Sequence, residues 1–561
     1  MSWEKPDVLV IGGGAAAAVA ALEASENCSV MMISKDRVMG GASIQAMGGI
    51  SLPGIAGEDL QVFIDDTINS GQGINDRVLL NVMAREGASY IPYLEGLGVV
   101  FDQDNSGKYR IFKKTEGHSV LRNYNDRRGF REAGRVLKAN LLQNKVRLLE
   151  HTMVFDLYSD SGRVLGCTAY SLKTGQLINI APKVVILAAG GYGRVYGISD
   201  NSTGLTGECH SMALDCGAEL MDMEMVQFIP IAFPYPEGMV GRIIGMCSLL
   251  GSNVKLYNGL GERFMTRYQP ETMEYATRDQ VARAMFQEIR DGRGTERGAI
   301  IVDTTENDPA SFQRYYDSMP SVYSALGRVF GEKAGRWEAT FEAVPSQHFC
   351  MGGVRINEEC RTGTCSNLFA AGEITGGVHG ANRLAGNALT EVVVFGKVAG
   401  RSAREEAVKN HIPSDAKLAD YFKRQASIID KLTSSDNDGP GITGAQLKDQ
   451  VGKVMWDSGG IVRNGNLLKE GIGKLAELKV EAEALKAQKG FHWNFSLAEA
   501  LEAKHMIKVG EAILKSALSR EESRGSHYRE DFPETDPAFL ANMVVFQRGD
   551  KLYCKKQSVK Q

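Results

Sequence analysis

The stretch DVLVIGGGAAAAVAALEASE, at residues 7–26, decides the fold of this chain. Residues 7–11 form a short apolar run of the kind that a buried parallel strand shows. Three glycines then turn the chain, and residues 15–26 have a strong helical pattern. A second apolar run, SVMMI at residues 29–33, follows. This order of strand, helix and strand predicts the first unit of a Rossmann-like α/β domain.

The glycines of this unit have the spacing Gly12-x-Gly14-x-x-Ala17, which is typical of dinucleotide-binding turns. Gly12 permits the tight turn, Gly14 lets the backbone approach a pyrophosphate, and Ala17 allows close packing of helix on strand. The spacing alone is a weak signal, and an ordinary Gly-rich turn is the alternative. After the second strand stand Ser34 and Lys35, where an NAD site usually has an acid. This argues against a site for free NAD.

The combination of an apolar strand and a Gly-rich turn recurs twice, far along the chain. VVILAA at residues 184–189 precedes Gly190 and Gly191. NLFAA at residues 367–371 precedes Gly372. Three strands of this kind predict one nucleotide-binding domain that an insertion interrupts.

After residue 405 the pattern becomes helical. Amphipathic periodicity predicts helices at 417–432, 446–454, 472–488 and 497–519. We therefore expect the first part of the nucleotide-binding domain at 1–239, an inserted α+β capping domain at 240–347, the second part of the nucleotide-binding domain at 348–405, a C-terminal helical domain at 406–530 and a C-terminal tail at 531–561.

Composition and charge exclude several classes of function. The chain of 561 residues is 43% hydrophobic and 24% charged, as in ordinary globular proteins. Its net charge of -4 provides no bulk field for binding nucleic acid or an acidic membrane. No apolar stretch is long enough for a membrane helix, and no signal peptide precedes the first strand. We expect a cytoplasmic protein that reaches a membrane only through partners.

The cysteines do not have the spacing of metal ligands. There are nine, scattered along the chain, and none forms a CxxC pair. The spacing of Cys360 and Cys365 matches no common site. We therefore expect no metal site in this chain, and reduced, buried thiols instead.

Later motifs make a family resemblance specific. GGAS at 40–43 and AMGGI at 46–50 resemble the early FAD-binding stretch of the family of fumarate reductase and succinate dehydrogenase flavoprotein subunits, to which L-aspartate oxidase is related. Further segments resemble that family in the same order: AAGG at 188–191, TGE at 206–208, GERFM at 261–265, TRDQV at 277–281, HFCMGG at 348–353, GANRL at 380–384 and SRGSHYRED at 523–531. These matches extend from residue 7 to about 533.

The resemblance implies FAD as the cofactor and a set of residues that bind it. These are Gly12, Gly14, Ala17, Ser34, Lys35, Gly41, Ala42, Ser43, Gly48, Gly49, Ala189, Gly190, Glu208, Glu373, Asn387 and Leu389. For Glu373 the alternative is an acid that caps a helix start.

The resemblance also implies how a carbon–carbon double bond next to a carboxylate is reduced. FAD supplies the hydride, and Arg278 matches the family's proton donor. Its proton could be relayed through Asp279 and Glu262, whereas without the family context a salt bridge with Asp279 would be favoured. Arg383 and His348 match the residues that hold a substrate carboxylate. A structural role is the alternative for His348.

Two departures from the family bear on the chemistry. Covalent members carry a His where this chain has Ala42, so we expect FAD to be bound noncovalently, which argues against efficient succinate oxidation. The family's His, Thr and Glu for the second substrate carboxylate correspond to apolar or thiol side chains, at Ile229, Ile231, Met246 and Cys247. An unpaired carboxylate there would cost several kcal/mol, which puts the C4 dicarboxylates in doubt.

The loop TEGHS at residues 115–119 is closer to the version in aspartate oxidases. We do not take it to predict aspartate oxidation, since the same dicarboxylate contacts are missing.

Three functional hypotheses follow. The first is a flavin-dependent reductase of an unsaturated carboxylate, or the reverse dehydrogenase. The second is fumarate reductase or succinate dehydrogenase proper, and the third is an FAD electron-transfer module with a vestigial substrate site. Each needs a partner, because the chain has neither cluster-binding cysteines nor a site for free NAD. We expect an iron–sulfur or other electron-transfer subunit, in the cytoplasm or peripherally at the inner face of a membrane through partners.

The first prediction concerns the bond between protein and FAD. Because Ala42 has no nucleophilic atom, acid precipitation of the purified protein should release yellow FAD into the supernatant. The flavin absorbance of the supernatant and of the redissolved washed pellet gives the fraction of FAD that is released. Flavin colour that stays in the pellet would contradict noncovalent binding.

Overall fold

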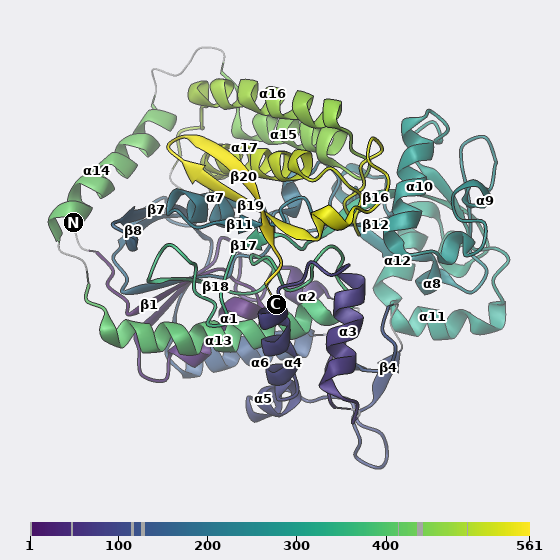
Figure 1. Cartoon of the computed structure of the whole chain (residues 1–561), viewed down its shortest axis with the longest axis horizontal. Helices are drawn as coiled ribbons and strands as arrows, with labels where there is room; N and C mark the ends of the chain where they lie inside the picture. Colours follow the sequence, from purple (N-terminus) through teal and green to yellow (C-terminus); the bar gives the residue numbers. More distant parts are fainter. Residues whose placement is uncertain are drawn as a thin grey trace.

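A parallel sheet forms the centre of the nucleotide-binding part of the molecule (Figure 1). The structure, a computed structural model, describes residues 3–46, 49–55, 57–113, 117–124, 130–412, 415–434, 441–490 and 492–560. The strands of this sheet lie in the order β18-β10-β1-β2-β6, with β1 at Val8–Ile11, β2 at Val30–Ile33, β6 at Arg147–Leu149, β10 at Val184–Leu187 and β18 at Leu368–Ala370. The three strands predicted to end in Gly-rich turns are therefore neighbours, which confirms the α/β prediction.

Both faces of this sheet are covered, which explains its continuous apolar strands. Every residue of β1, β2 and β10 is buried. Helices α1 (Ala15–Ala24) and α13 (Asn387–Lys409) pack against each other beside the sheet (Figure 1). A Cβ on Gly396 would lie 2.9 Å from the carbonyl oxygen of Ala16, and one on Gly400 would lie 2.5 Å from that of Ala20. These glycines allow the two helices to approach closely.

Shorter elements complete this part of the chain. They include two small antiparallel sheets, in the orders β3-β5-β4 and β7-β8-β9. Their bounds and those of the accompanying helices are α2 Ala42–Gln45, β3 Ile50–Ser51, α3 Leu60–Ser70, α4 Arg77–Gly87, α5 Tyr90–Gly96, β4 Ile111–Lys113, β5 Asn123–Tyr124, α6 Arg131–Gln143, β7 Thr152–Asp160, β8 Arg163–Ser171, β9 Leu177–Ile180 and α7 Glu208–Asp215.

The capping domain has its own sheet and its own core. The strand order is β13-β12-β16-β15-β14. Strand β12 lies wholly before the predicted range 240–347, and β16 extends past its end. Ile231, Phe264, Met285 and Trp337 belong to a separate cluster of buried apolar side chains. The elements are β12 Val226–Ala232, β13 Ile243–Gly245, α8 Cys247–Leu250, β14 Lys255–Tyr257, α9 Met265–Tyr268, α10 Arg278–Arg290, β15 Ile300–Asp303, α11 Phe312–Ser318, α12 Pro320–Phe330 and β16 Phe341–Cys350.

The helical part contains α14 Asp415–Leu432, α15 Gly444–Gly459, α16 Gly465–Glu481 and α17 Phe495–Ser519. The prediction of a helix at 472–488 is wrong in its bounds, because the side chain of Asn464 accepts a hydrogen bond from the backbone of Leu467 and starts α16 earlier. Likewise, α15 exceeds the predicted 446–454 and starts at a capping box formed by Thr443 and Gln446. Figure 1 shows α15, α16 and α17 stacked together, with α14 apart from them.

The last residues, predicted only as a tail, form the hairpin of β19 (Ala541–Arg548) and β20 (Lys551–Ser558). It extends the sheet β17-β11-β19-β20, in which β11 is Leu220–Met221 and β17 is Gly353–Val354. Arg520, fully buried, binds Glu224 at 2.6 Å, Glu522 at 2.9 Å and the carbonyl of Ala541 at 2.9 Å. This ion cluster joins the hairpin to the end of α17.

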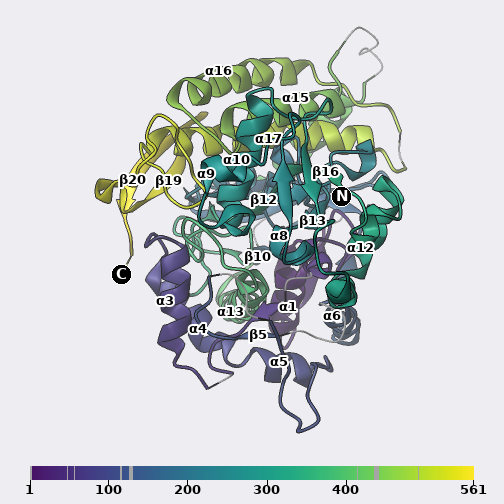
Figure 2. The ribbon, with the colours of Figure 1, turned by 90° about the vertical axis from the view of Figure 1, so that its right-hand side faces the viewer.

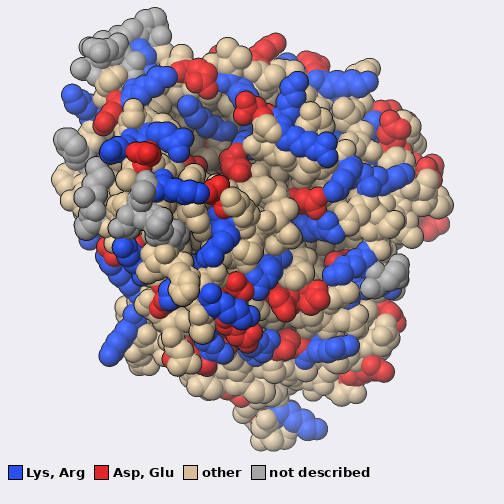
Figure 3. All heavy atoms as spheres, turned by 60° about the vertical axis from the view of Figure 1, so that its left-hand side comes forward, with Lys and Arg blue, Asp and Glu red and all other residues tan. Residues whose placement is uncertain are grey.

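The capping domain projects to one side of the parallel sheet, as Figure 2 shows from that side. Acidic and basic side chains are mixed over the face that Figure 3 presents. None of the described helices combines the length and apolarity needed to cross a membrane. In the same described part of the chain, no cluster of His, Cys, Asp and Glu has the arrangement of a metal site.

Candidate active site

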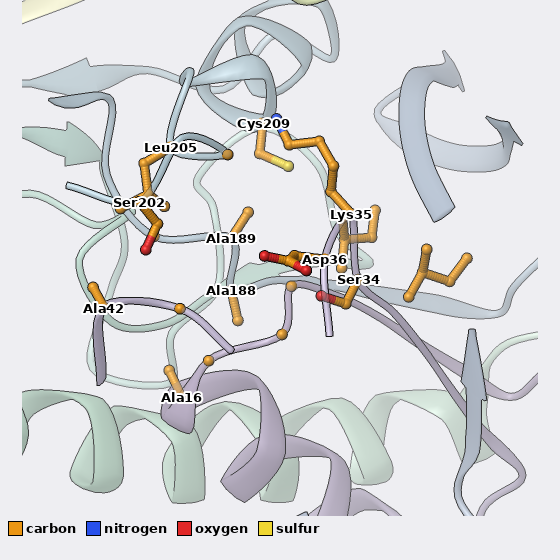
Figure 4. A pocket seen from close by; sticks show the side chains of 18 of the residues that line it. Ala16, Ser34, Lys35, Asp36, Ala42, Ala188, Ala189, Ser202, Leu205 and Cys209 are labelled. Atoms are coloured by element: carbon orange, nitrogen blue, oxygen red, sulfur yellow. The ribbon is translucent and has the colours of Figure 1, made fainter. Parts of the chain in front are cut away.

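A cavity lies at the carboxyl edge of the parallel sheet (Figure 4). Its walls are the segments that follow β1, β2, β10 and β18, the edge where open α/β sheets bind nucleotides. Figure 4 shows Ser202 and Leu205 across the cavity from Ser34 and Lys35. The predicted cofactor residues that line it are Gly12, Gly14, Ser34, Lys35, Gly41, Ala42, Ser43, Ala189, Gly190, Glu208 and Glu373.

The turn between β1 and α1 leaves room for a phosphate group. Gly12 has a φ of +141°, and a Cβ there would lie 2.0 Å from the carbonyl oxygen of Ala188, so no other residue fits. Gly14 is the N-cap of α1, and residues 14–16 line the cavity. The first backbone N–H of the helix, that of Ala15, donates to the hydroxyl of Ser43 at 3.2 Å. A Cβ on Gly41 would have no atom within 4 Å. This cradle fits the pyrophosphate of a dinucleotide.

Lys35 is the centre of an ion cluster at the cavity wall. Its Nζ lies 2.6 Å from Glu208, 2.6 Å from Glu502 and 2.9 Å from the hydroxyl of Thr206. Burial works against the ionised forms, but the mutual attraction outweighs it. The pKa of Lys35 is therefore raised and the pKa of Glu208 is lowered from their ordinary values. Because Glu502 belongs to α17, the cluster joins the helical part to the cavity.

Glu373 follows the turn after β18 and lies at the same cavity. Its Oε1 accepts a hydrogen bond from the backbone N–H of Cys350 at 3.2 Å. Burial raises the pKa of Glu373 to about 7, because the ionised form loses its hydration. The carboxyl group therefore faces the cavity close to the midpoint of its titration at neutral pH.

The remaining predicted cofactor residues do not line this cavity. Ala17 is buried within α1, where it packs against the sheet. Gly48 lies outside the described residues, as do Thr115 and Glu116 of the loop likened to aspartate oxidase. Gly49, Asn387 and Leu389 lie elsewhere, and the Asn387 amide donates to the hydroxyl of Thr67 at 3.1 Å. Their roles in FAD binding stay predictions.

The predicted proton donor, Arg278, and the predicted substrate-binding residue Arg383 converge on one side chain. Arg278 is the first residue of α10 and is nearly buried, and Arg383 is buried in the segment before α13. Both donate to Oε1 of Gln227, from Arg383 at 3.0 Å and from Arg278 at 3.4 Å. Gln227 lies on β12, so the capping sheet and the nucleotide-binding part meet at this amide.

Arg383 is poorly satisfied in this environment. Its guanidinium lies 4.5 Å from the ring centre of Phe349, and its buried Nε has no hydrogen-bond partner among the described residues. Within the same part of the chain, no carboxylate pairs with it within 4 Å. Burial, and secondarily the nearby Arg278, lowers the pKa of Arg383 to about 9. An anion bound here would give the Nε of Arg383 a hydrogen-bond acceptor and would stabilise the charged guanidinium.

His348 lies on β16 and has a fixed orientation. Its Nδ1 lies 2.6 Å from a carboxylate oxygen of Asp200, and its side chain is 24% exposed. The backbone carbonyl of His348 accepts a hydrogen bond from Asn201 at 2.8 Å. Asp200 also acts electrostatically on Arg383. The Asp200 carboxylate therefore both orients His348 and favours the charged form of Arg383.

A second, smaller cavity lies beside Arg278. Met246 and Cys247 line it with Arg278, as do Ser248 and Glu274. The two side chains aligned with the family's second carboxylate site thus share a cavity with the predicted proton donor. Ile229 and Ile231 are buried on β12, and Ile231 belongs to the capping core.

The two acids considered as proton relays have other partners. Glu262 accepts from Asn258 at 2.8 Å and Arg267 at 3.0 Å, and Asp279 pairs with Arg283 at 3.9 Å. Their role as relays stays a prediction.

Sequence reasoning missed the roles of Gln227 and Asp200. Gln227 stands in the motif QFIPI, two residues before Ile229, the first position that departs from the family, which is a signal that it lies at the site. Asp200 follows no motif, and only the three-dimensional structure brings it to His348.

Known families and proteins match almost the whole chain. Residues 7–389 match the FAD binding domain family, and residues 448–561 match the fumarate reductase flavoprotein C-terminal family. The fumarate reductase (CoM/CoB) of Methanothermobacter marburgensis has a polypeptide that is 34% identical over 96% of each chain. The fumarate reductase flavoprotein subunit of Escherichia coli is 28% identical, over 98% of this chain and 93% of that one. The FrdA polypeptide of Escherichia coli quinol fumarate reductase superposes with a TM-score of 0.90 and 28% identity, covering 100% of this chain and 98% of that chain.

Fold, cavity and matches together define an FAD-dependent oxidoreductase. The chain belongs to the family of fumarate reductase and succinate dehydrogenase flavoprotein subunits. It binds FAD and acts on CH–CH bonds, which confirms the predicted cofactor and enzyme class. The two enzymatic hypotheses are therefore better supported than that of an electron-transfer module without a substrate.

The second prediction concerns the pH dependence of the FAD-free protein. The pKa of Glu373 is about 7 in the folded state, against an ordinary value of 4.5. The folded state holds this proton more tightly, so the free energy of unfolding should fall as pH rises from about 4.5 to about 7 and then level off. Between about pH 5 and about pH 8 this fall amounts to about 2–3 kcal/mol, and Glu373→Gln should remove it.

Urea unfolding at about pH 5 and about pH 8 measures the effect. Glu359→Gln, on the exposed surface, is the matched control and should keep the wild-type difference between the two pH values. A wild-type difference in Glu373→Gln would contradict the assignment.

Proposed function

We propose that this chain transfers hydride between FAD and an α,β-unsaturated carboxylate whose other end is neutral or bulky. The observation that carries the proposal is the pair Arg278 and Arg383, buried and bound to one neutral amide oxygen. With no carboxylate of the described residues neutralising Arg383, the pair forms a receptor for one substrate carboxylate. Beside Arg278, Met246 and Cys247 line a small cavity that has no further cation among its described residues for a second carboxylate.

The residues divide the work of the reaction. FAD, when bound, supplies or accepts the hydride. Arg383 has the planar fork that binds a carboxylate bidentately and keeps the double bond in register. His348, oriented by Asp200, presents its Nε2 to the same carboxylate. Arg278 delivers the proton to the carbon that does not receive hydride, or removes it in the reverse direction.

The apolar end should decide the substrate. Beside the buried side chains of Ile229 and Cys247 and the partly buried Met246, an ionised carboxylate would lose its hydration without meeting a cation other than Arg278 among the described residues of this cavity. A neutral tail suffers no such loss. Selection against fumarate would therefore come from desolvation rather than from size.

Fumarate itself is the second candidate substrate. It is favoured by the names of the relatives, since the proteins of Methanothermobacter marburgensis and Escherichia coli are both fumarate reductases. The capping-domain cations considered for its second carboxylate are Arg242, which is exposed, and Lys255, which pairs with Glu306 at 2.5 Å. Neither lines the cavity beside Arg278.

An electron-transfer partner is part of the proposal. The relatives are named as subunits of larger enzymes, and no cysteine pattern in this chain suits an iron–sulfur cluster. We infer that the partner is an iron–sulfur or other electron-transfer subunit. The complex would work in the cytoplasm, or at the inner face of a membrane through that partner.

The third prediction tests the proton donor. Arg278→Ala should retain FAD, because Arg278 does not line the nucleotide cavity, and should lose about 10²–10⁴-fold in kcat. Flavin absorbance measures FAD content, and enoate-dependent reoxidation of the reduced enzyme measures turnover. Arg328→Ala, on the exposed face of α12, should behave as wild type. An active Arg278→Ala enzyme would refute the role.

The fourth prediction separates the two substrates. Anaerobically reduced enzyme should be reoxidised faster by monocarboxylate enoates with a neutral tail than by fumarate, by at least about tenfold in kcat/KM. Stopped-flow absorbance of the flavin, with crotonate, longer 2-enoates and fumarate, gives the ranking. If fumarate has by far the highest kcat/KM, the chain is a fumarate reductase and the apolar-end proposal fails.

A further inference from the structure

Gln227 is completely buried between the two arginines and uses its whole amide group. Its Oε1 accepts from Arg383 and from Arg278, at 3.0 and 3.4 Å. Its Nε2 donates to the side-chain oxygen of Asn382 at 2.6 Å and to the backbone carbonyl of Arg383 at 3.1 Å. The two hydrogen bonds that Nε2 donates fix the orientation of the amide group, so Oε1 points toward both guanidinium groups.

This arrangement offsets a repulsion. Two buried guanidinium groups in the same site disfavour each other's charge, and Arg278 contributes to the lowered pKa of Arg383. The negative end of the Gln227 amide dipole faces both groups and attracts them. An amide does not cancel the charge of Arg383, however, whereas a carboxylate in its place would bind this guanidinium more strongly and neutralise it.

We infer that Gln227 is a positioning residue that orients Arg278 and Arg383 through one neutral acceptor, and so leaves the positive charge of Arg383 un-neutralised for the substrate carboxylate. The inference rests on the proposed function, because it assumes that a carboxylate binds at this pair. A substrate carboxylate is a stronger acceptor than an amide, so it takes over the guanidinium groups without meeting a like charge.

Two substitutions of similar size separate charge from shape. Gln227→Glu adds a negative charge between the arginines and should weaken the binding of a substrate carboxylate at least about tenfold. It should raise KM for the enoate more than it lowers kcat. Gln227→Met removes the acceptor without adding charge, so the two guanidinium groups should separate and kcat should fall as well.

The pH profile of binding gives a readout that a merely structural role would not move. The charged groups that act on Arg383 are Arg278, Glu373, Glu391 and Asp200. With a pKa of Arg383 of about 9, wild-type carboxylate binding should decline above about pH 9. In Gln227→Glu this decline should move to higher pH, and in Gln227→Met to lower pH, since the first stabilises the cation and the second does not.

The experiment is anaerobic calorimetric titration of the FAD-loaded protein, with its flavin kept reduced, with butanoate, a saturated acid that reduced flavin cannot reduce further, and with butanamide as the neutral control. Gln446→Glu, at the start of α15 where the capping box accepts either side chain, is the matched control and should bind as wild type. Butanoate binding to Gln227→Glu with wild-type affinity and an unmoved pH limit would overturn the inference. Wild-type protein that binds neither butanoate nor any enoate would instead overturn the proposed function itself.

Discussion

The parallel pairing of β1 with β10 and β2 is the constraint on which the rest of the structure depends. Val8 pairs with both Val184 and Val30, so the three strands end at one edge. The strands approach so closely at Gly12 that a Cβ would lie 2.0 Å from the carbonyl oxygen of Ala188. Because the chain turns sharply at Gly12, a space remains in front of α1, and the first residues of this helix and Lys35 line it. The nucleotide cavity is thus a consequence of strand register.

The positions of Arg278 and Arg383 depend on a second contact between segments that are distant in the sequence. β12 leaves the nucleotide-binding part and enters the capping sheet, where it pairs with β16. Gln227 therefore stands where Arg278, from the capping helix α10, reaches Arg383, from the segment before α13. In the described part of the chain, no carboxylate lies within ion-pair distance of Arg383. The neutral amide of Gln227 orients the Arg383 guanidinium without neutralising it. One side chain therefore determines both the geometry of the site and its positive electrostatic potential.

Much of this could be predicted from the sequence, because short-range patterns define it. The apolar strands, the Gly12 turn and α1 follow from local composition, and the cofactor-cavity residues follow those strands directly. The bounds of α16 could not be found from periodicity, since a single cap at Asn464 decides them. The hairpin β19–β20 was missed because it is stabilised by distant partners, β11 and Arg520. Asp200 and Gln227 acquire their roles only through contacts across more than a hundred residues.

The position of β18 has a consequence for how the protein is made. This strand, Leu368–Ala370, completes the sheet beside β10, although the whole capping segment lies between the two in the sequence. The ribosome must therefore release that segment before the sheet can close. Until then the apolar edge of β10 is unpaired and open to wrong association. Pairing across such a sequence separation is slow, so this edge stays unpaired for longer than the edges of a protein built from local contacts.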